Sequence, residues 1–77
     1  MENKTLNQIW ESLDRAGRRK LYEEIIVGTR TTEQTFRLWV RGKKSPKSYN
    51  TQEKIAECVK AVTGIETTPE VLFPEKL

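Results

Sequence analysis

TTEQTFRLWVRGKKSPK, residues 31–47, is the stretch on which the interpretation of the whole sequence depends. Phe36, Trp39 and Val40 recur at the spacing of one helix face, which predicts an amphipathic helix over about 31–41. The other positions are polar and then basic, and the stretch ends in three lysines around a proline. A helix that serves only the core needs the aromatic residues but not the basic tail, whereas a binding surface can use both.

Apolar residues repeat at helical spacing on both sides of this stretch and predict further helices. The expected helices cover about 5–14, 17–27, 31–41, 51–63 and 68–73. No second β-rich run exists to pair with Ile25–Val27, so a helix is preferred over a strand there. The 77 residues amount to one domain. Their apolar faces can share one core, so we expect an all-α fold, a compact bundle of four helices plus a short fifth that contains a helix-turn-helix.

Polar residues and glycines indicate where these helices begin and end. The candidate N-caps are Thr5, Asp14, Thr31 or Thr32, Thr51 and Thr68. The expected C-terminal glycines are Gly28, Gly42 and Gly64, and Gly17 is expected to weaken helix continuity. The connection between the second and third helices, residues 28–30, is then very short, which predicts a tight turn.

The composition limits the class of protein. The net charge is +3, with basic residues concentrated in the middle of the chain and acidic ones toward its C-terminal end. The single Cys58 cannot form a disulfide within one chain, which fits a reducing compartment. The sequence contains no apolar run of membrane-spanning length and no signal-peptide hydrophobic region, so a soluble, cytoplasmic protein without a membrane partner is expected.

Residue types that carry enzyme chemistry are missing from the sequence. It has no histidine, which removes the commonest general base and a common metal ligand. Cys58 has no histidine with which to form a nucleophile pair, and no glycine-rich nucleotide-binding motif occurs. We therefore expect no catalytic residues, metal site or cofactor, no small-molecule ligand, and no enzyme activity.

The 31–41 helix offers side chains that suit base pairs. Arginine can donate to guanine, glutamine can bond adenine, glutamate can accept from cytosine, and a leucine or threonine methyl group can touch thymine. The expected base contacts are Thr32, Glu33, Gln34, Arg37 and Leu38. The expected phosphate contacts are Arg18, Arg19, Arg30, Arg41, Lys43, Lys44, Ser45 and Lys47. For each of them the competing interpretation is an ordinary solvated surface.

From Leu21 onward, the order and spacing of several motifs resemble the lambda-repressor-like, Cro-type helix-turn-helix proteins of bacterial and mobile-element genomes. The motifs are T-x-x-x-W-x-x-G-K-x-x-P at 35–46, E-K-I-A at 53–56 and T-P-E-x-L-F-P at 68–74. The resemblance implies a transcriptional regulator that reads the major groove of double-stranded DNA, with a homodimer as a possible assembly.

This chain departs from the family at two positions. The family usually has a small residue where Ile26 falls and a glycine near Arg30, whereas here Gly28 comes earlier. A longer turn and a differently shaped turn are both open.

Two other functions fit the same sequence. A protein-interaction module that keeps the helix-turn-helix fold without DNA binding would use the acidic C-terminal end and the Leu77 tail. RNA binding is less favoured because no exposed aromatic platform is evident.

Overall fold

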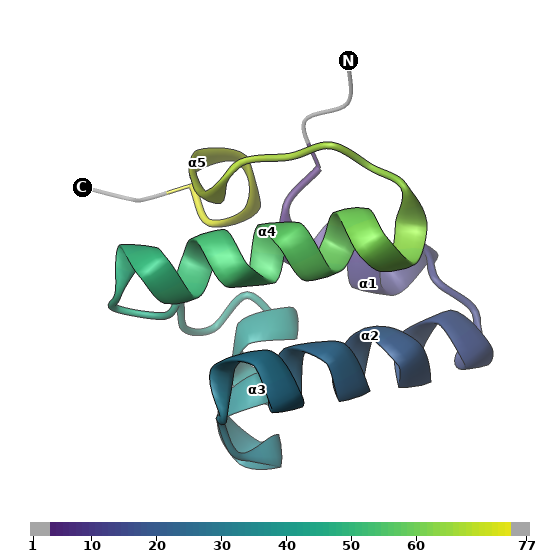
Figure 1. Ribbon diagram of the computed structural model, residues 1–77, viewed down its shortest axis with the longest axis horizontal. Coiled ribbons are helices and arrows are strands. Elements are labelled where there is room, and N and C mark those ends of the chain that lie inside the picture. The colour runs from purple at the N-terminus through teal and green to yellow at the C-terminus, as the bar shows by residue number, and fades with distance from the viewer. Residues whose placement is uncertain (1–3, 75–77) are drawn as a thin grey trace.

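The computed structural model describes residues 4–74, and the regular secondary structure in that range is entirely helical. The helices are α1 (Leu6–Ser12), α2 (Arg15–Thr29), α3 (Glu33–Val40), α4 (Tyr49–Thr63) and α5 (Pro69–Leu72). Figure 1 shows α2 and α4 side by side, α5 against the opposite side of α4, and α3 leading away from the body to an edge of the molecule. The expected all-α bundle of four helices and a short fifth is therefore confirmed. None of the helices in residues 4–74 combines the length and the apolar character that crossing a bilayer requires.

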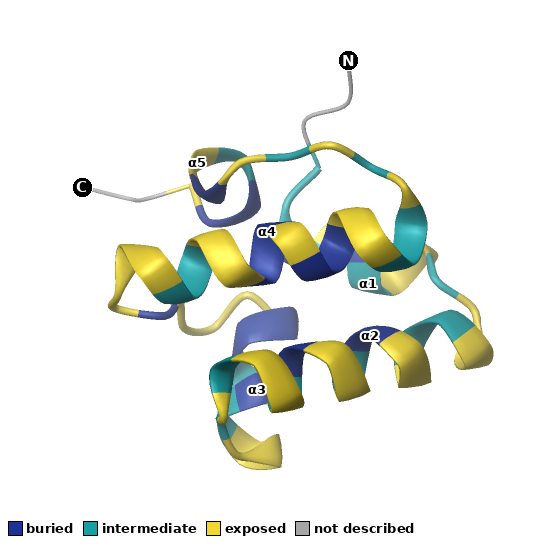
Figure 2. Cartoon of the chain, in the orientation of Figure 1, coloured by how far each residue is buried: buried dark blue, intermediate teal, exposed yellow. Residues whose placement is uncertain are grey.

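One core joins all five helices. Figure 2 shows that the sides of the helices that face one another are buried and that their outer sides are exposed. The buried apolar residues are Leu6, Ile9, Leu21, Ile25, Phe36, Trp39, Val40, Ile55, Ala56, Cys58, Val59, Leu72 and Phe73. The predicted inward face of the central helix, Phe36, Trp39 and Val40, is thus confirmed, and the Ile25–Val27 run is helical as expected.

Side-chain caps begin the first three helices. Thr5 forms a capping box with Gln8, in which each side chain bonds the backbone N–H of the other residue. Thr32 accepts the N–H of Thr35 at the start of α3. Asp14 caps α2 by accepting the N–H of Gly17 at 2.8 Å. This bond confirms the expected cap at Asp14 and places Gly17 in the first turn of α2. Helix continuity is interrupted at residues 13–14, not weakened at Gly17 as expected.

The turn between α2 and α3 differs from the expected one. Gly28 does not end α2, because the helix continues to Thr29 and Arg30 is its C-cap. Arg30 adopts the left-handed conformation, with φ 56°, and its N–H donates to the Ile26 carbonyl at 2.8 Å. Arg30 thus adopts a backbone conformation that favours glycine, and the connection between α2 and α3 lies at 30–32 rather than at the expected 28–30.

The start of α4 also lies elsewhere than expected. Ser48, not Thr51, is the N-cap, and its hydroxyl accepts the Thr51 N–H at 3.4 Å. Pro46 is buried, and its carbonyl accepts a bond of 2.7 Å from the Gln52 side chain. This bond holds the preceding loop against α4. Because Ser48 is the cap, α4 begins at Tyr49, two residues before the expected start at 51. At α5, Thr68 occupies the N-cap position without a side-chain capping bond.

The strained conformation of Arg30 predicts a stabilising substitution. The left-handed conformation costs a non-glycine residue roughly 1–2 kcal/mol, and the greater freedom of glycine in the unfolded chain offsets roughly 0.5–1 kcal/mol of that. Arg30→Gly should therefore raise the free energy of unfolding by roughly 0.5–1 kcal/mol, measured by urea denaturation. Arg30→Ala is the control because it removes the same charge and keeps the strain. If the glycine variant were no more stable than the alanine variant, the strain at Arg30 would be refuted.

Candidate nucleic-acid interface

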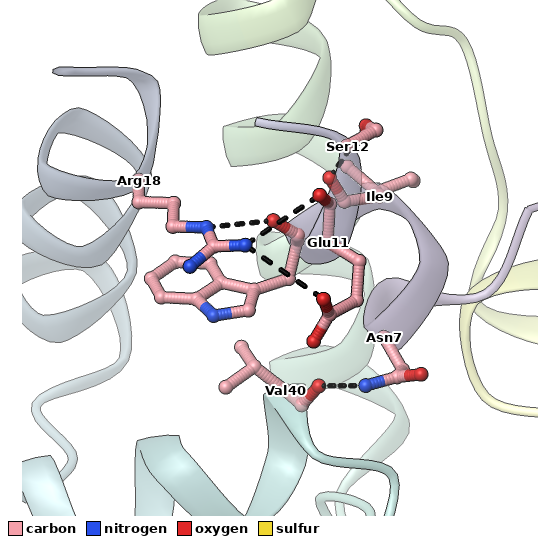
Figure 3. Close-up of polar contacts among 7 residues, drawn as sticks. Asn7, Ile9, Glu11, Ser12, Arg18 and Val40 are labelled. Carbon is pink, nitrogen blue, oxygen red and sulfur yellow. Dashed lines mark hydrogen bonds and ion pairs between the residues drawn. The ribbon is translucent and has the colours of Figure 1, made fainter. Parts of the chain in front are cut away.

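An aromatic cluster fixes α3 against α1 and α2. The ring of Phe36 lies edge-to-face with Trp10 of α1, at 5.2 Å between centroids, and with Tyr22 of α2, at 5.1 Å. The far end of α3 is held by Asn7 of α1, whose side-chain amide donates to the Val40 carbonyl at 2.6 Å (Figure 3). α3 is thus tied to the body at its middle and at its C-terminal end, and its polar face is left to solvent.

The expected base-contact residues lie on this remaining surface. Thr32, Glu33, Gln34 and Arg37 are all exposed. Leu38 is the exception, because it is half-buried rather than fully outward. The exposed set occupies the first turns of α3, which Figure 1 shows at the lower edge of the molecule, with α5 at its upper side.

The end of α3 sets the backbone of the basic loop. Gly42 is left-handed, with φ 76°, and its N–H donates to the Trp39 carbonyl. The N–H of Lys43 donates to the Leu38 carbonyl at 3.0 Å, and that of Lys44 to the same oxygen at 3.3 Å. This is a Schellman arrangement with Gly42 just past the helix, so the expected stop at this glycine is confirmed. These hydrogen bonds therefore fix the backbone at Lys43 and Lys44 relative to the end of α3.

A groove of about 520 Å³ lies where α3 meets α1 and the first turns of α2. Its aromatic lining is the Phe36 cluster described above. Its cationic lining comes from two helices and the residue after α3, and the five side chains are Arg15, Arg18, Arg19, Arg37 and Arg41. Four of these arginines were expected at an interface, and the fold collects them around one concave surface.

Three of the groove arginines already have carboxylate partners. Arg37 pairs with Glu33 at 2.7 Å, and Arg19 pairs with Glu23 at 3.4 Å, each across one helical turn. The third, Arg18, also reaches to α1: its Nε donates to the Trp10 carbonyl at 2.9 Å, and its Nη2 lies 3.8 Å from the Glu11 carboxylate (Figure 3). Its guanidinium stands over the indole ring, 5.4 Å from the centroid. Arg18 therefore joins α1 to α2.

Arg15 is a groove residue that sequence reasoning missed. The expected helix began at residue 17, which left Arg15 outside it. Asp14 was an expected N-cap, and because the structure confirms this cap, Arg15 is the first residue of α2. Starting the helix directly after its expected cap would have found Arg15. Among the residues that the structure describes, neither Arg15 nor Arg41 has an ion-pair partner.

A second groove, of about 650 Å³, continues from the end of α3. Arg41 lines both grooves, and Lys43, Lys44 and Ser45 line this one together with Asn7. Across the described part of the chain, the two loop lysines make no ion pair. The expected contacts that line neither groove are Arg30, Thr32, Gln34, Leu38 and Lys47, all of which are exposed except the half-buried Leu38.

The junction of α4 and α5 has the opposite charge. A shallow groove of about 320 Å³ there is lined by Tyr49 and three carboxylates, Glu53, Glu57 and Glu70. The Tyr49 hydroxyl donates to Glu70 at 3.0 Å, and this hydrogen bond raises the pKa of Tyr49. The backbone N–H of Glu70 and, after it, the Tyr49 hydroxyl lower the pKa of the Glu70 carboxyl group. This carboxylate cluster has no arginine or lysine in its lining, unlike the groove beside α3, in which arginines and glutamates are paired. The Leu77 tail of the expected interaction surface lies outside the described residues.

Compared with family models, curated proteins and solved structures, the chain matches none of them. The resemblance to lambda-repressor-like proteins therefore rests on the residues quoted above.

Cys58 is part of the hydrophobic core: it is 7% exposed, and burial raises the pKa of its thiol.

The contacts of Arg18 predict that it supports the fold, unlike its neighbour Arg15. Arg18→Ala removes the bond to the Trp10 carbonyl and the stacking on its ring, and should lower the free energy of unfolding by about 1 kcal/mol. Arg15→Ala, the matched control in the same groove, should change it by less than about 0.5 kcal/mol. Thermal denaturation of both variants tests this difference. Equal melting temperatures for the two would contradict the assignment of Arg18 to the α1–α2 contact.

Proposed function

We propose that this chain is a sequence-specific double-stranded DNA-binding protein that regulates transcription. The single observation that carries the proposal is the exposed polar face of α3, which has one basic groove along its side, a second at its C-terminal end, and an aromatic contact behind it. Base-reading side chains need a helix that projects from the body, and phosphates need cations on either side of it. Both conditions are met on one side of the molecule.

The dimensions of α3 support this assignment. Its eight residues make a helix that is about 12 Å long and, with side chains, about 10–12 Å across. The major groove of B-form DNA is about 12 Å wide and admits one such helix. In this arrangement α2 and α3 form a helix-turn-helix, and the first turns of α3 enter the groove. The exposed side chains proposed to meet base edges are then Thr32, Glu33, Gln34 and Arg37.

Unpaired cations complete the proposed interface. Arg15 and Arg41 lie beside α3 without carboxylate partners among the described residues, and the loop lysines begin directly after Gly42. Phosphates are the anions that such cations would meet on either side of a major groove. The carboxylates at the α4–α5 junction would be repelled by the same phosphates, which favours one orientation of the molecule on the duplex.

The proposed function also implies a cellular compartment and an oligomeric state. A regulator of this kind acts where bacterial DNA lies, in the cytoplasm, and the single Cys58 thiol suits a reducing compartment. Two copies on paired half-sites are the proposed assembly, since helix-turn-helix regulators commonly bind as dimers. The number of protein copies per duplex, measured by analytical ultracentrifugation, tests that part.

Binding to duplex DNA should weaken steeply with salt. The affinity is expected to fall with a logarithmic slope of about −0.9 per neutralised phosphate, so about six contacts would cost roughly a thousandfold between 50 and 200 mM salt. Fluorescence anisotropy with a labelled random-sequence duplex measures this slope. A flat response over that range, or no binding at the lowest salt, would contradict the proposed function.

Single lysine substitutions localise the phosphate contacts. Lys43→Ala and Lys44→Ala should each reduce the magnitude of the salt slope by about 1, and weaken binding to all sequences alike. Lys60→Ala is the matched control. This lysine lies in the last turn of α4, away from the basic loop, and it pairs with the Glu66 carboxylate. If the Lys60 variant lost as much of the slope as the loop variants, binding through the loop would be excluded.

A further inference from the structure

One ion pair lies on the face of α3 that is proposed to meet base pairs. Nη2 of Arg37 lies 2.7 Å from Oε2 of Glu33, one helical turn away, and the two side chains remain 60% and 55% exposed. An exposed pair of this kind contributes little to stability. Its importance lies in the hydrogen-bonding groups that it presents to solvent side by side.

The pair presents donors next to an acceptor. A guanidinium group has five N–H donors, and only Nη2 of Arg37 contacts the glutamate. The edge of the guanidinium that remains can donate twice, while the Glu33 carboxylate beside it keeps lone pairs free to accept. Read across the pair, the order is donor, donor, acceptor.

This order complements one orientation of one base pair. In the major groove a G·C pair offers two acceptors on guanine, N7 and O6, and then a donor on cytosine, N4. An A·T pair offers acceptor, donor, acceptor, which would set N6–H of adenine against an arginine donor and O4 of thymine against the carboxylate. A C·G pair, in the reversed orientation, also opposes like groups at two of the three positions.

We propose that Glu33 and Arg37 act as one unit that reads a G·C base pair in the target sequence. This inference rests on the proposed DNA binding and names the base pair that α3 selects. Arg37 supplies the attraction for guanine. Glu33 holds the guanidinium in position, accepts from cytosine, and disfavours any base pair that places an acceptor opposite its carboxylate.

A second ion pair supplies a matched control. Arg19 and Glu23 have the same one-turn spacing on α2, with an N–O distance of 3.4 Å and side chains that are 81% and 60% exposed. Glu23→Ala removes the same charge from the protein as Glu33→Ala. Only Glu33 lies on the helix that is proposed to enter the major groove, so effects of charge and effects of base reading can be separated.

The test begins with selection of preferred sites by the full-length chain from a random duplex pool. Each base pair of the selected site is then replaced, and the dissociation constant is measured by anisotropy. Replacing the G·C pair read by α3 with A·T should weaken binding about tenfold to a hundredfold. Replacing guanine with inosine should leave the affinity unchanged, because inosine·C presents the same major-groove edge.

The variants then assign the discrimination to the ion pair. Glu33→Ala should reduce the G·C preference at that position by about tenfold or more and strengthen binding to random duplex. Glu23→Ala should retain the G·C preference, and circular dichroism should confirm that both variants keep their helix content. If the wild-type chain selects a site but Glu33→Ala discriminates as well as wild type, the ion-pair inference is wrong and DNA binding stands. If the wild-type chain binds no duplex, both proposals are overturned.

Discussion

The position of Phe36 between two other aromatic rings is the interaction on which the surface of α3 depends. Its partners come from different helices, Trp10 from α1 and Tyr22 from α2, so three helices meet at one ring. Each edge-to-face pair contributes about 0.5–1.5 kcal/mol beyond the burial of the rings. Because Phe36 is 2% exposed, α3 cannot turn about its own axis without exposing a large apolar side chain to water.

This constraint determines what the other faces of α3 can do. Because Phe36, Trp39 and Val40 are buried in the core, the polar residues at the start of α3 are exposed at the edge of the molecule. Ion pairs then organise part of that surface, because Glu33 holds Arg37 and Glu11 holds Arg18. The remaining cations stay unpaired within residues 4–74, apart from Lys4, Arg19 and Lys60, which have partners of their own. The result is a basic surface on which carboxylate partners fix the position of some cationic side chains, while other cations have no ion-pair partner among residues 4–74 and can bind anions.

Much of the fold could be predicted because helical spacing reports directly which side of a helix is buried. The same spacing placed Gln34 and Arg37 outward, and both are exposed. Other features depend on three-dimensional context. The end of α2 depends on a left-handed Arg30, a conformation that a sequence pattern assigns to glycine. The attachment of Arg18 to α1, and the place of Arg15 in the same groove, follow from how two helices pack, which no local pattern records.

We propose that the fixed, outward face of α3 and the loop after it form the surface that meets DNA. Chemical-shift mapping measures this contact, with ¹⁵N-labelled protein titrated with a random-sequence duplex at low salt. The largest shifts are expected on residues 31–47, with further shifts at the start of α2 around Arg15, while the α4–α5 junction stays unchanged. Shifts centred on that junction, or no shifts in residues 31–47, would contradict it.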